Sequence, residues 1–181
     1  MGLVLLLILG WCIAMFIATV YTAHMLMHPP RRTYASAVAR GLPGDPGELP
    51  IPLRFTEFTI TSRGNTLAAW DIAGQCEQGP IFVLLHGWAE SRLSALARVP
   101  ALVPLASRLI ALDLPGHGSS TGASSLGALE PLDVHELLRQ LPMDRPIILY
   151  GWSKGAGLAI AAAATLPTPL RVDAVISESP Y

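Results

Sequence analysis

The sequence predicts an α/β domain with a mostly parallel sheet and flanking helices, preceded by one N-terminal transmembrane helix. Two observations support this prediction. Residues 3–21 form an apolar run without a charged residue, and from residue 81 onward short apolar runs alternate with helical segments. Such alternation is typical of βαβ units, which build parallel sheets. The length of 181 residues is enough for one domain and an appendage.

The apolar N-terminus has the length of a membrane span. As a helix, Leu3–Tyr21 would be about 28 Å long, close to the hydrocarbon thickness of a bilayer. A secretory signal peptide would have a basic start and a shorter apolar core, and no Lys or Arg precedes this run. We therefore expect residues 1–27 to be a retained anchor. A cleaved signal peptide and a buried core helix are the alternatives.

Residues 28–52 are expected to be a linker, because they are rich in proline and glycine and show no clear periodicity. Arg31, Arg32 and Arg40 follow the apolar run, and positive charge favours the cytoplasmic side of a membrane span. The sequence thus predicts a single-pass membrane protein whose globular domain, residues 53–181, lies in the cytoplasm.

The elements of this domain follow from apolar patterning and turn residues. Alternating residues around an Arg-Gly-Asn turn predict a hairpin of strands 54–62 and 66–72. Continuous apolar runs, typical of strands buried on both faces, predict strands at 81–87, 108–116, 146–151 and 171–179. Helices are expected at 91–106, 126–141 and 153–166. The second is amphipathic, with a predicted core stripe of Leu132, His135, Leu138 and Leu141.

Charge and motif content exclude several function classes. The net charge is −1, so the basic surface typical of nucleic-acid binding is missing. The His, Cys and Asp residues do not show metal-ligand spacing, and the sequence contains neither a GxxxxGK[ST] nor a GxGxxG phosphate loop. We expect no metal, no cofactor and no nucleic-acid partner.

One serine lies where a predicted strand meets a predicted helix. Ser153 is flanked by Gly151 and Gly155 in a G-x-S-x-G pattern. A nucleophile on such a sharp turn exposes its hydroxyl above the sheet, and side chains two residues away would crowd the turn. Small residues at 157, 159 and 161–164 would let the helix pack closely on the sheet. The pattern predicts a nucleophilic serine.

Three motifs occur in a characteristic order: LLHGW at 84–88, DLPGHGSS at 113–120 and GWSKGAG at 151–157. With them, the chain from about Leu53 onward resembles the alpha/beta-hydrolase superfamily, near its lysophospholipase-like and serine-aminopeptidase-like branches. The resemblance covers roughly the N-terminal half of a typical hydrolase domain. It implies an acyl-transfer enzyme without a cofactor.

The resemblance assigns roles to individual residues. Ser153 would be the nucleophile, and the backbone N–H groups of Trp88 and Lys154 would form the oxyanion hole. His86 would shape the oxyanion loop. Glu178 would be the triad acid, with a loop or salt-bridge role as the alternative.

The sequence departs from the family pattern after the nucleophile. The family order is Ser, acid, His, yet no histidine follows Ser153. We therefore expect a truncated domain that lacks C-terminal strands and is inactive alone, unless a complementing chain supplies the rest. The last strand would then have an exposed, apolar edge.

Two functions are compatible with these features. The first is a membrane-bound serine hydrolase, an esterase or lysophospholipase-like enzyme, acting on small ester or related acyl substrates; the membrane makes lipophilic ones plausible. The alternative is a non-catalytic, membrane-tethered binding module with a degenerate hydrolase fold.

Overall fold

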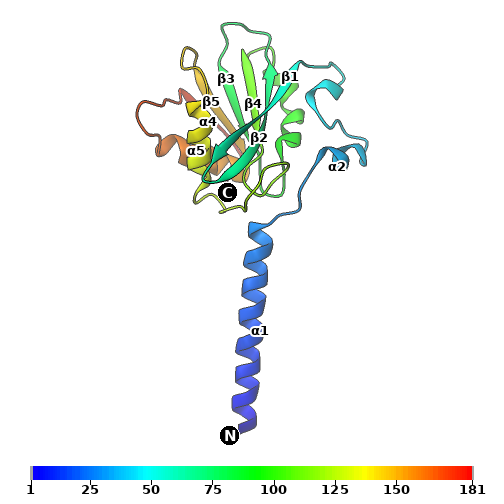
Figure 1. Ribbon diagram of the computed structural model, residues 1–181, viewed down its shortest axis with the longest axis vertical. Helices are drawn as coiled ribbons and strands as arrows, with labels where there is room; N and C mark the ends of the chain where they lie inside the picture. Colours follow the sequence, from blue (N-terminus) through cyan, green and yellow to red (C-terminus); the bar gives the residue numbers. More distant parts are fainter. Residues whose placement is uncertain (1, 181) are drawn as a thin grey trace.

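The computed structural model describes residues 2–180 and contains one six-stranded sheet (Figure 1). Met1 and Tyr181, the outer limits of the predicted anchor and domain, lie outside the described residues. The strand order is β1-β2-β4-β3-β5-β6. The strands are β1 (Phe55–Ser62), β2 (Asn65–Ala73), β3 (Ile81–Leu85), β4 (Arg108–Leu112), β5 (Ile147–Trp152) and β6 (Ala174–Glu178). The helices are α1 (Gly2–Met27), α2 (Tyr34–Val38), α3 (Val99–Leu102), α4 (Glu130–Arg139) and α5 (Lys154–Ala164), with 3₁₀ turns η1 (Pro46–Glu48) and η2 (Arg92–Ala97).

The central part of the sheet is parallel, as the sequence predicts. β3 pairs in parallel with both β4 and β5, and β5 pairs in parallel with β6. The carboxyl ends of these four strands therefore lie along one edge of the sheet. In open α/β sheets this is the edge at which ligands bind.

The first two strands form the predicted hairpin and extend the sheet in antiparallel fashion. Their turn places Arg63 at φ 49° and Gly64 at φ 77°. Two successive positive φ values are typical of a type I′ turn, whose twist matches that of paired strands. Glycine at the second position lowers the cost of this geometry.

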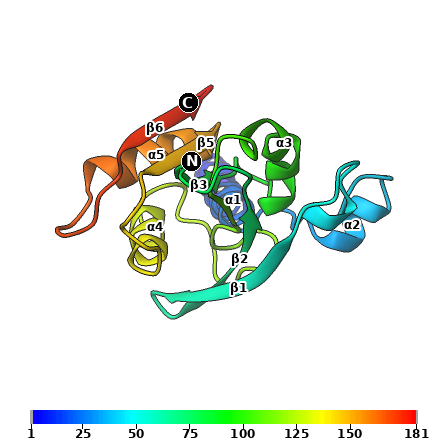
Figure 2. The same ribbon diagram turned by 90° about the horizontal axis from the view of Figure 1, so that it is seen from above.

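The sheet separates two hydrophobic cores, and Figure 2 shows α4 and α5 on one face and α3 on the other. In β3 all five residues are buried because alternate side chains enter opposite cores. Ile81, Val83 and Leu85 pack with α4 and α5, whereas Phe82 and Leu84 pack with η2 and α3. This explains the continuous apolar run in the sequence.

Two details of the helix predictions are wrong. The helix expected at 91–106 is broken into η2 and the short α3, because Pro100 sits in the first turn of α3 and Pro104 follows its end. In α4, Leu132 is 49% exposed rather than part of the core stripe. Val134 and Leu137 face the core instead, beside the correctly predicted Leu138.

Helix α1 projects from the domain as an isolated rod (Figure 1). It has no buried residue, and its most apolar 18-residue window has a mean hydropathy of 2.8. Its exposure excludes the buried core helix as an explanation of the apolar run. By length and composition it is able to cross a membrane, a property that a signal sequence shares.

Candidate active site

Ser153 occupies a strained turn between β5 and α5. Its backbone has φ 52° and ψ −124°, a conformation rarely adopted by residues other than glycine. The residue is exposed, while its neighbours Trp152 and Lys154 are buried. The turn thus presents the serine at the carboxyl edge of the parallel strands.

The two glycines of the G-x-S-x-G pattern are required by close backbone contacts. A Cβ on Gly151 would lie 2.0 Å from the carbonyl oxygen of Gly155. A Cβ on Gly155 would lie 2.0 Å from the carbonyl oxygen of Leu85, at the end of β3. Both distances are far below van der Waals contact, so only glycine fits at either position.

The loop that follows β3 packs directly against this turn. A Cβ built on Gly87 would lie 3.3 Å from the Cβ of Ser153. Trp88 comes next, and within residues 2–180 its backbone N–H has no hydrogen-bond acceptor. The N–H of Lys154 opens α5 and has no acceptor within that helix. One backbone donor, the N–H of Lys154, therefore follows Ser153 directly in the chain, and the other, the N–H of Trp88, lies in the loop after β3.

His86 holds the loops after β3 and β4 together. It is fully buried; its Nδ1 lies 2.7 Å from the carbonyl oxygen of Gly87, and its Nε2 accepts the N–H of Leu114 at 3.0 Å. These partners assign the proton to Nδ1 and leave neither nitrogen free. Burial, reinforced by the nearby His117, places the pKa of His86 well below its usual value of 6.5. The ring is thus a neutral structural link.

The loop after β4 is fixed by the buried Asp113. Its carboxylate accepts the N–H of Arg92 at 2.7 Å and that of Ser119 at 2.9 Å. Burial raises the pKa of Asp113, and these hydrogen bonds oppose that rise. The carboxylate thus orders the loop after β4.

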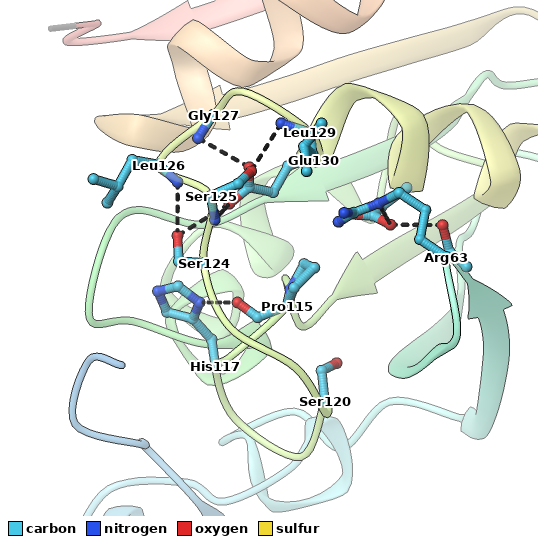
Figure 3. Close-up of polar contacts among 12 residues, drawn as sticks. Arg63, Pro115, His117, Ser120, Ser124, Ser125, Leu126, Gly127, Leu129 and Glu130 are labelled. Carbon is cyan, nitrogen blue, oxygen red and sulfur yellow. Dashed lines mark hydrogen bonds and ion pairs between the residues drawn. The ribbon is translucent and has the colours of Figure 1, made fainter. Parts of the chain in front are cut away.

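The side chain of Lys154 runs beneath the site to a buried acidic residue. Its Nζ donates to the Ser124 hydroxyl at 2.7 Å and lies 3.3 Å from Oε1 of Glu130. Figure 3 shows the Glu130 carboxylate enclosed by its own loop, where it accepts hydrogen bonds from Ser124, Ser125 and Gly127. This network ties the turn at Ser153 to the loop after β4.

The opposite charges of Lys154 and Glu130 stabilise this buried network. Desolvation raises the pKa of Glu130, but the Lys154 ammonium and the hydrogen bonds outweigh it and lower that pKa to about 2. Burial lowers the pKa of Lys154, which the Glu130 carboxylate opposes. The pairing also occupies the amino group that would have to act as the neutral base if Ser153 and Lys154 formed a Ser–Lys catalytic pair.

His117 lies beside the same network with one nitrogen unpartnered. Its Nδ1 is 2.9 Å from the carbonyl oxygen of Pro115, whereas Nε2 is buried without a hydrogen bond within the described residues (Figure 3). Burial and the Lys154 charge lower the pKa of His117 to about 4. The ring is thus neutral near pH 7.

Glu178, at the end of β6, lies beside the turn through its backbone. Its carbonyl oxygen accepts the N–H of Ser153 at 2.9 Å. Its carboxylate forms a two-point ion pair with Arg98, at 2.7 and 2.9 Å, and accepts the Tyr150 hydroxyl at 2.8 Å. The salt-bridge role is therefore realised in this structure.

The sequence analysis did not identify Glu90. Its Oε2 accepts the N–H of Gly87 at 3.2 Å and the indole N–H of Trp152, the residue before Ser153. A Cβ on Gly87 would lie 3.3 Å from that oxygen, the same separation as from the Ser153 Cβ. A carboxylate thus lies close to the serine. Glu90 belongs to no motif, and only the loop fold brings it there.

A groove opens beside Glu90. It has a volume of about 450 Å³ and lies between the 32–49 arm and η2. Its apolar lining includes Leu42, Leu49 and Leu93, and Arg32, Arg40 and Arg98 add positive charge. The groove has the size of a small-ligand pocket.

Comparison with known proteins agrees with this architecture. A sequence profile described as the alpha/beta hydrolase fold matches residues 80–181. The pimeloyl-[acyl-carrier protein] methyl ester esterase of Xanthomonas oryzae pv. oryzae is 42% identical over 104 residues, covering 56% of this chain and 38% of the esterase. The magnesium-chelatase 30 kDa subunit of Rhodobacter capsulatus is 31% identical over 128 residues, covering 69% of this chain and 44% of the subunit. The chain thus spans less than half the length of these relatives.

Solved structures show the same fold. An esterase of Pyrococcus furiosus superposes with a TM-score of 0.66 at 23% identity, covering 86% of this chain and 56% of the esterase. An epoxide hydrolase of Vigna radiata superposes with a TM-score of 0.56 at 25% identity, covering 67% of this chain and 37% of that one. Together with the profile match over more than half of its length, these likenesses show that the chain belongs to the alpha/beta hydrolase family.

Proposed function

We propose that this chain carries the nucleophile half of a membrane-anchored serine hydrolase that cleaves ester or related acyl bonds. The observation that carries the proposal is the conformation of Ser153, an exposed serine at φ 52° that lies beside the loop after β3. Strain of this kind costs about 1–3 kcal/mol and is concentrated at functional sites. Esterases among the relatives support the same reaction class.

The proposed chemistry follows from the groups around the serine. The Oγ of Ser153 attacks the acyl carbon and forms a tetrahedral intermediate, while its proton passes to a base. The N–H groups of Trp88 and Lys154 stabilise the developing oxyanion, and each such donor contributes about 3–4 kcal/mol in known enzymes. Collapse of the intermediate releases the alcohol, and water then hydrolyses the acyl-serine.

The base is the missing part of this mechanism. His86 is neutral with both nitrogens occupied, and no histidine follows Ser153 in the sequence. We propose that the base comes from a later part of a longer chain or from a complementing chain. The acid role of Glu178 stays a prediction, which requires its carboxylate to leave Arg98.

For the substrate we propose a lipophilic ester with one acyl chain. The isolated apolar α1 supports a membrane anchor, and the groove that Glu90 lines offers apolar side chains for an acyl chain. A lysophospholipid-like ester fits this combination, and esters would be preferred to the amides of a serine-aminopeptidase-like enzyme. A cytoplasmic domain remains part of the proposal and is testable by protease protection in sealed vesicles.

A chemical-rescue experiment tests the reaction class. Removing triad members from a serine protease leaves about 10³–10⁴-fold catalysis over water, so weak activity should persist without the base. We expect the folded chain in detergent micelles to hydrolyse p-nitrophenyl butyrate slowly, and added imidazole to increase the Ser153-dependent rate at least several-fold. The rate with Ser153→Ala gives the background, and Ser177→Ala is the matched control.

A specific observation favours the alternative of a non-catalytic, membrane-tethered binding module. His86 and His117, which pack together beside the loop after β3, are both buried, and both ring nitrogens of His86 are hydrogen-bonded. If the folded protein and Ser153→Ala hydrolyse the ester equally, with and without imidazole, the hydrolase proposal fails and the binding module is the better explanation.

A further inference from the structure

The domain end of α1 is hydrogen-bonded to the loops that surround Ser153. The carbonyl oxygen of Leu26 accepts the indole N–H of Trp88 at 3.0 Å, and that of Met27 accepts the N–H of Ser124 at 2.8 Å. The last carbonyls of a helix have no partners within it, so these two bonds cap α1. One partner comes from the loop after β3, the other from the loop after β4.

A third contact follows directly after the helix. Arg31 donates from Nη1 to the carbonyl oxygens of Gly118 and Ser120, at 3.0 and 2.6 Å. Both acceptors lie in the loop after β4. The end of α1 and the residues that follow it are therefore held at the carboxyl edge of the sheet. In Figure 1, α1 leaves the domain from this end.

The length of α1 places this edge close to lipid headgroups. A helix from Gly2 to Met27 is about 39 Å long, which exceeds the roughly 30 Å of bilayer hydrocarbon. If the apolar run spans the hydrocarbon, Leu26 and Met27 reach the interfacial layer together with the loops bonded to them.

The same loops expose apolar side chains. Trp88 is 40% exposed, and Leu126 and Leu129 are 43% and 46% exposed. Figure 3 shows Leu126 pointing away from the Glu130 network. Tryptophan is enriched at membrane interfaces, where an apolar ring and a polar N–H are both accommodated. An edge with such side chains is suited to contact with lipid.

We propose that the catalytic edge faces the bilayer and that Ser153 takes its substrate, an acyl ester held in the leaflet, directly from the membrane surface. This rests on the proposed anchor role of α1. The domain is not a freely rotating enzyme on a tether, because contacts on two loops fix the direction in which α1 leaves it.

Depth-dependent fluorescence quenching tests the orientation without requiring turnover. Cys12 and Cys76 are both free. Retaining only Cys12 gives a reporter inside α1. Replacing both by Ser gives a background in which one new cysteine carries the fluorescent label bimane. The label is placed at Leu126→Cys, on the catalytic edge, or at Gln78→Cys, in the exposed loop before β3 at the opposite edge. The protein is reconstituted in phosphatidylcholine vesicles that contain lipids with a nitroxide near the headgroup or deep in the acyl chain.

We expect quenching at Cys12 by the deep nitroxide, and quenching at Leu126→Cys by the headgroup nitroxide at least three-fold stronger than at Gln78→Cys. Arg31→Ala should reduce the contrast between the two edges. Arg40→Ala should preserve it, because the side-chain hydrogen bonds of Arg40 go to Ser36 and not to the loops that hold α1. If Cys12 is quenched but the two edges are quenched equally, the orientation is refuted and the anchor stands. If Cys12 is not quenched, the anchor fails and the orientation fails with it.

Discussion

At the residue scale, the turn at Ser153 depends on two positions at which even a Cβ atom would clash with the backbone. The sequence predicts this from the G-x-S-x-G pattern, and the backbone contacts of Gly151 and Gly155 supply the physical reason. The network of Lys154, Ser124 and Glu130 could not be predicted in the same way. Its members come from segments far apart in sequence, and only the folded loops bring them together.

Gly155→Ala should destabilise the protein by about 1–3 kcal/mol, because the new Cβ would lie 2.0 Å from the Leu85 carbonyl oxygen. Gly157→Ala is the matched control on the same helix, since its Cβ would meet nothing within 4 Å. There, alanine should stabilise by about 0.5–1 kcal/mol. Urea unfolding followed by circular dichroism measures both variants, and equal effects would refute the packing argument.

Lys154→Met should cost about 3–5 kcal/mol, because it leaves the buried Glu130 carboxylate without its cation. Adding Glu130→Gln should recover much of this loss, since the amide keeps a hydrogen-bonding group without the charge. A double-mutant cycle measured by chemical unfolding separates the interaction energy of the Lys154–Glu130 pair from the effects of the single substitutions. Simple additivity of the two losses would contradict the ion-pair interpretation.

The same pair predicts acid sensitivity. The pKa of Glu130 is lowered to about 2 from its usual 4.5, so the charged carboxylate stabilises the fold fully above about pH 4.5. That contribution should be lost as the pH falls towards 2. The difference in unfolding free energy between the native protein and Glu130→Gln should therefore shrink over this range. A difference independent of pH between 2 and 6 would argue against the shift.

At the element scale, the buried strands are the best predicted parts of the molecule. β3 and β4 come from continuous apolar runs, which burial on both faces explains. The helix expected at 91–106 was less predictable, because its apolar content suggested a helix while two prolines interrupted it. The predicted exposed edge is present: β6 pairs with β5, and no second strand pairs with it in residues 2–180.

An unpaired strand edge of this kind favours association of the 181-residue chain with itself. Val175 and Ile176 on β6 are 36% and 40% exposed, and a charged residue on an edge strand opposes pairing. Ile176→Lys should therefore reduce oligomers in sedimentation velocity runs at constant detergent. Ile160→Lys, which replaces an isoleucine 48% exposed on α5, should have little effect. An equal reduction by both changes would indicate hydrophobic patches rather than the strand edge.

At the scale of the whole molecule, the apolar helix α1 and the hydrolase domain are held together by hydrogen bonds. The sequence predicts both parts separately, from hydropathy and from three motifs in order. It does not predict that α1 contacts the loops around Ser153. The contact is made by hydrogen bonds that Trp88, Ser124 and Arg31 donate to backbone carbonyl oxygens, and such bonds have no sequence signature. That contact links the proposed chemistry to the proposed membrane anchor.

The central claim is that Ser153 is a nucleophile, and mapping of a covalent adduct tests it most directly. The folded chain in micelles is treated with a fluorophosphonate probe, digested and analysed by mass spectrometry. We expect one adduct, on the peptide that contains Ser153, absent from Ser153→Ala and retained in Ser177→Ala. An unlabelled protein with an intact fold, or an adduct on a different serine, would contradict the claim.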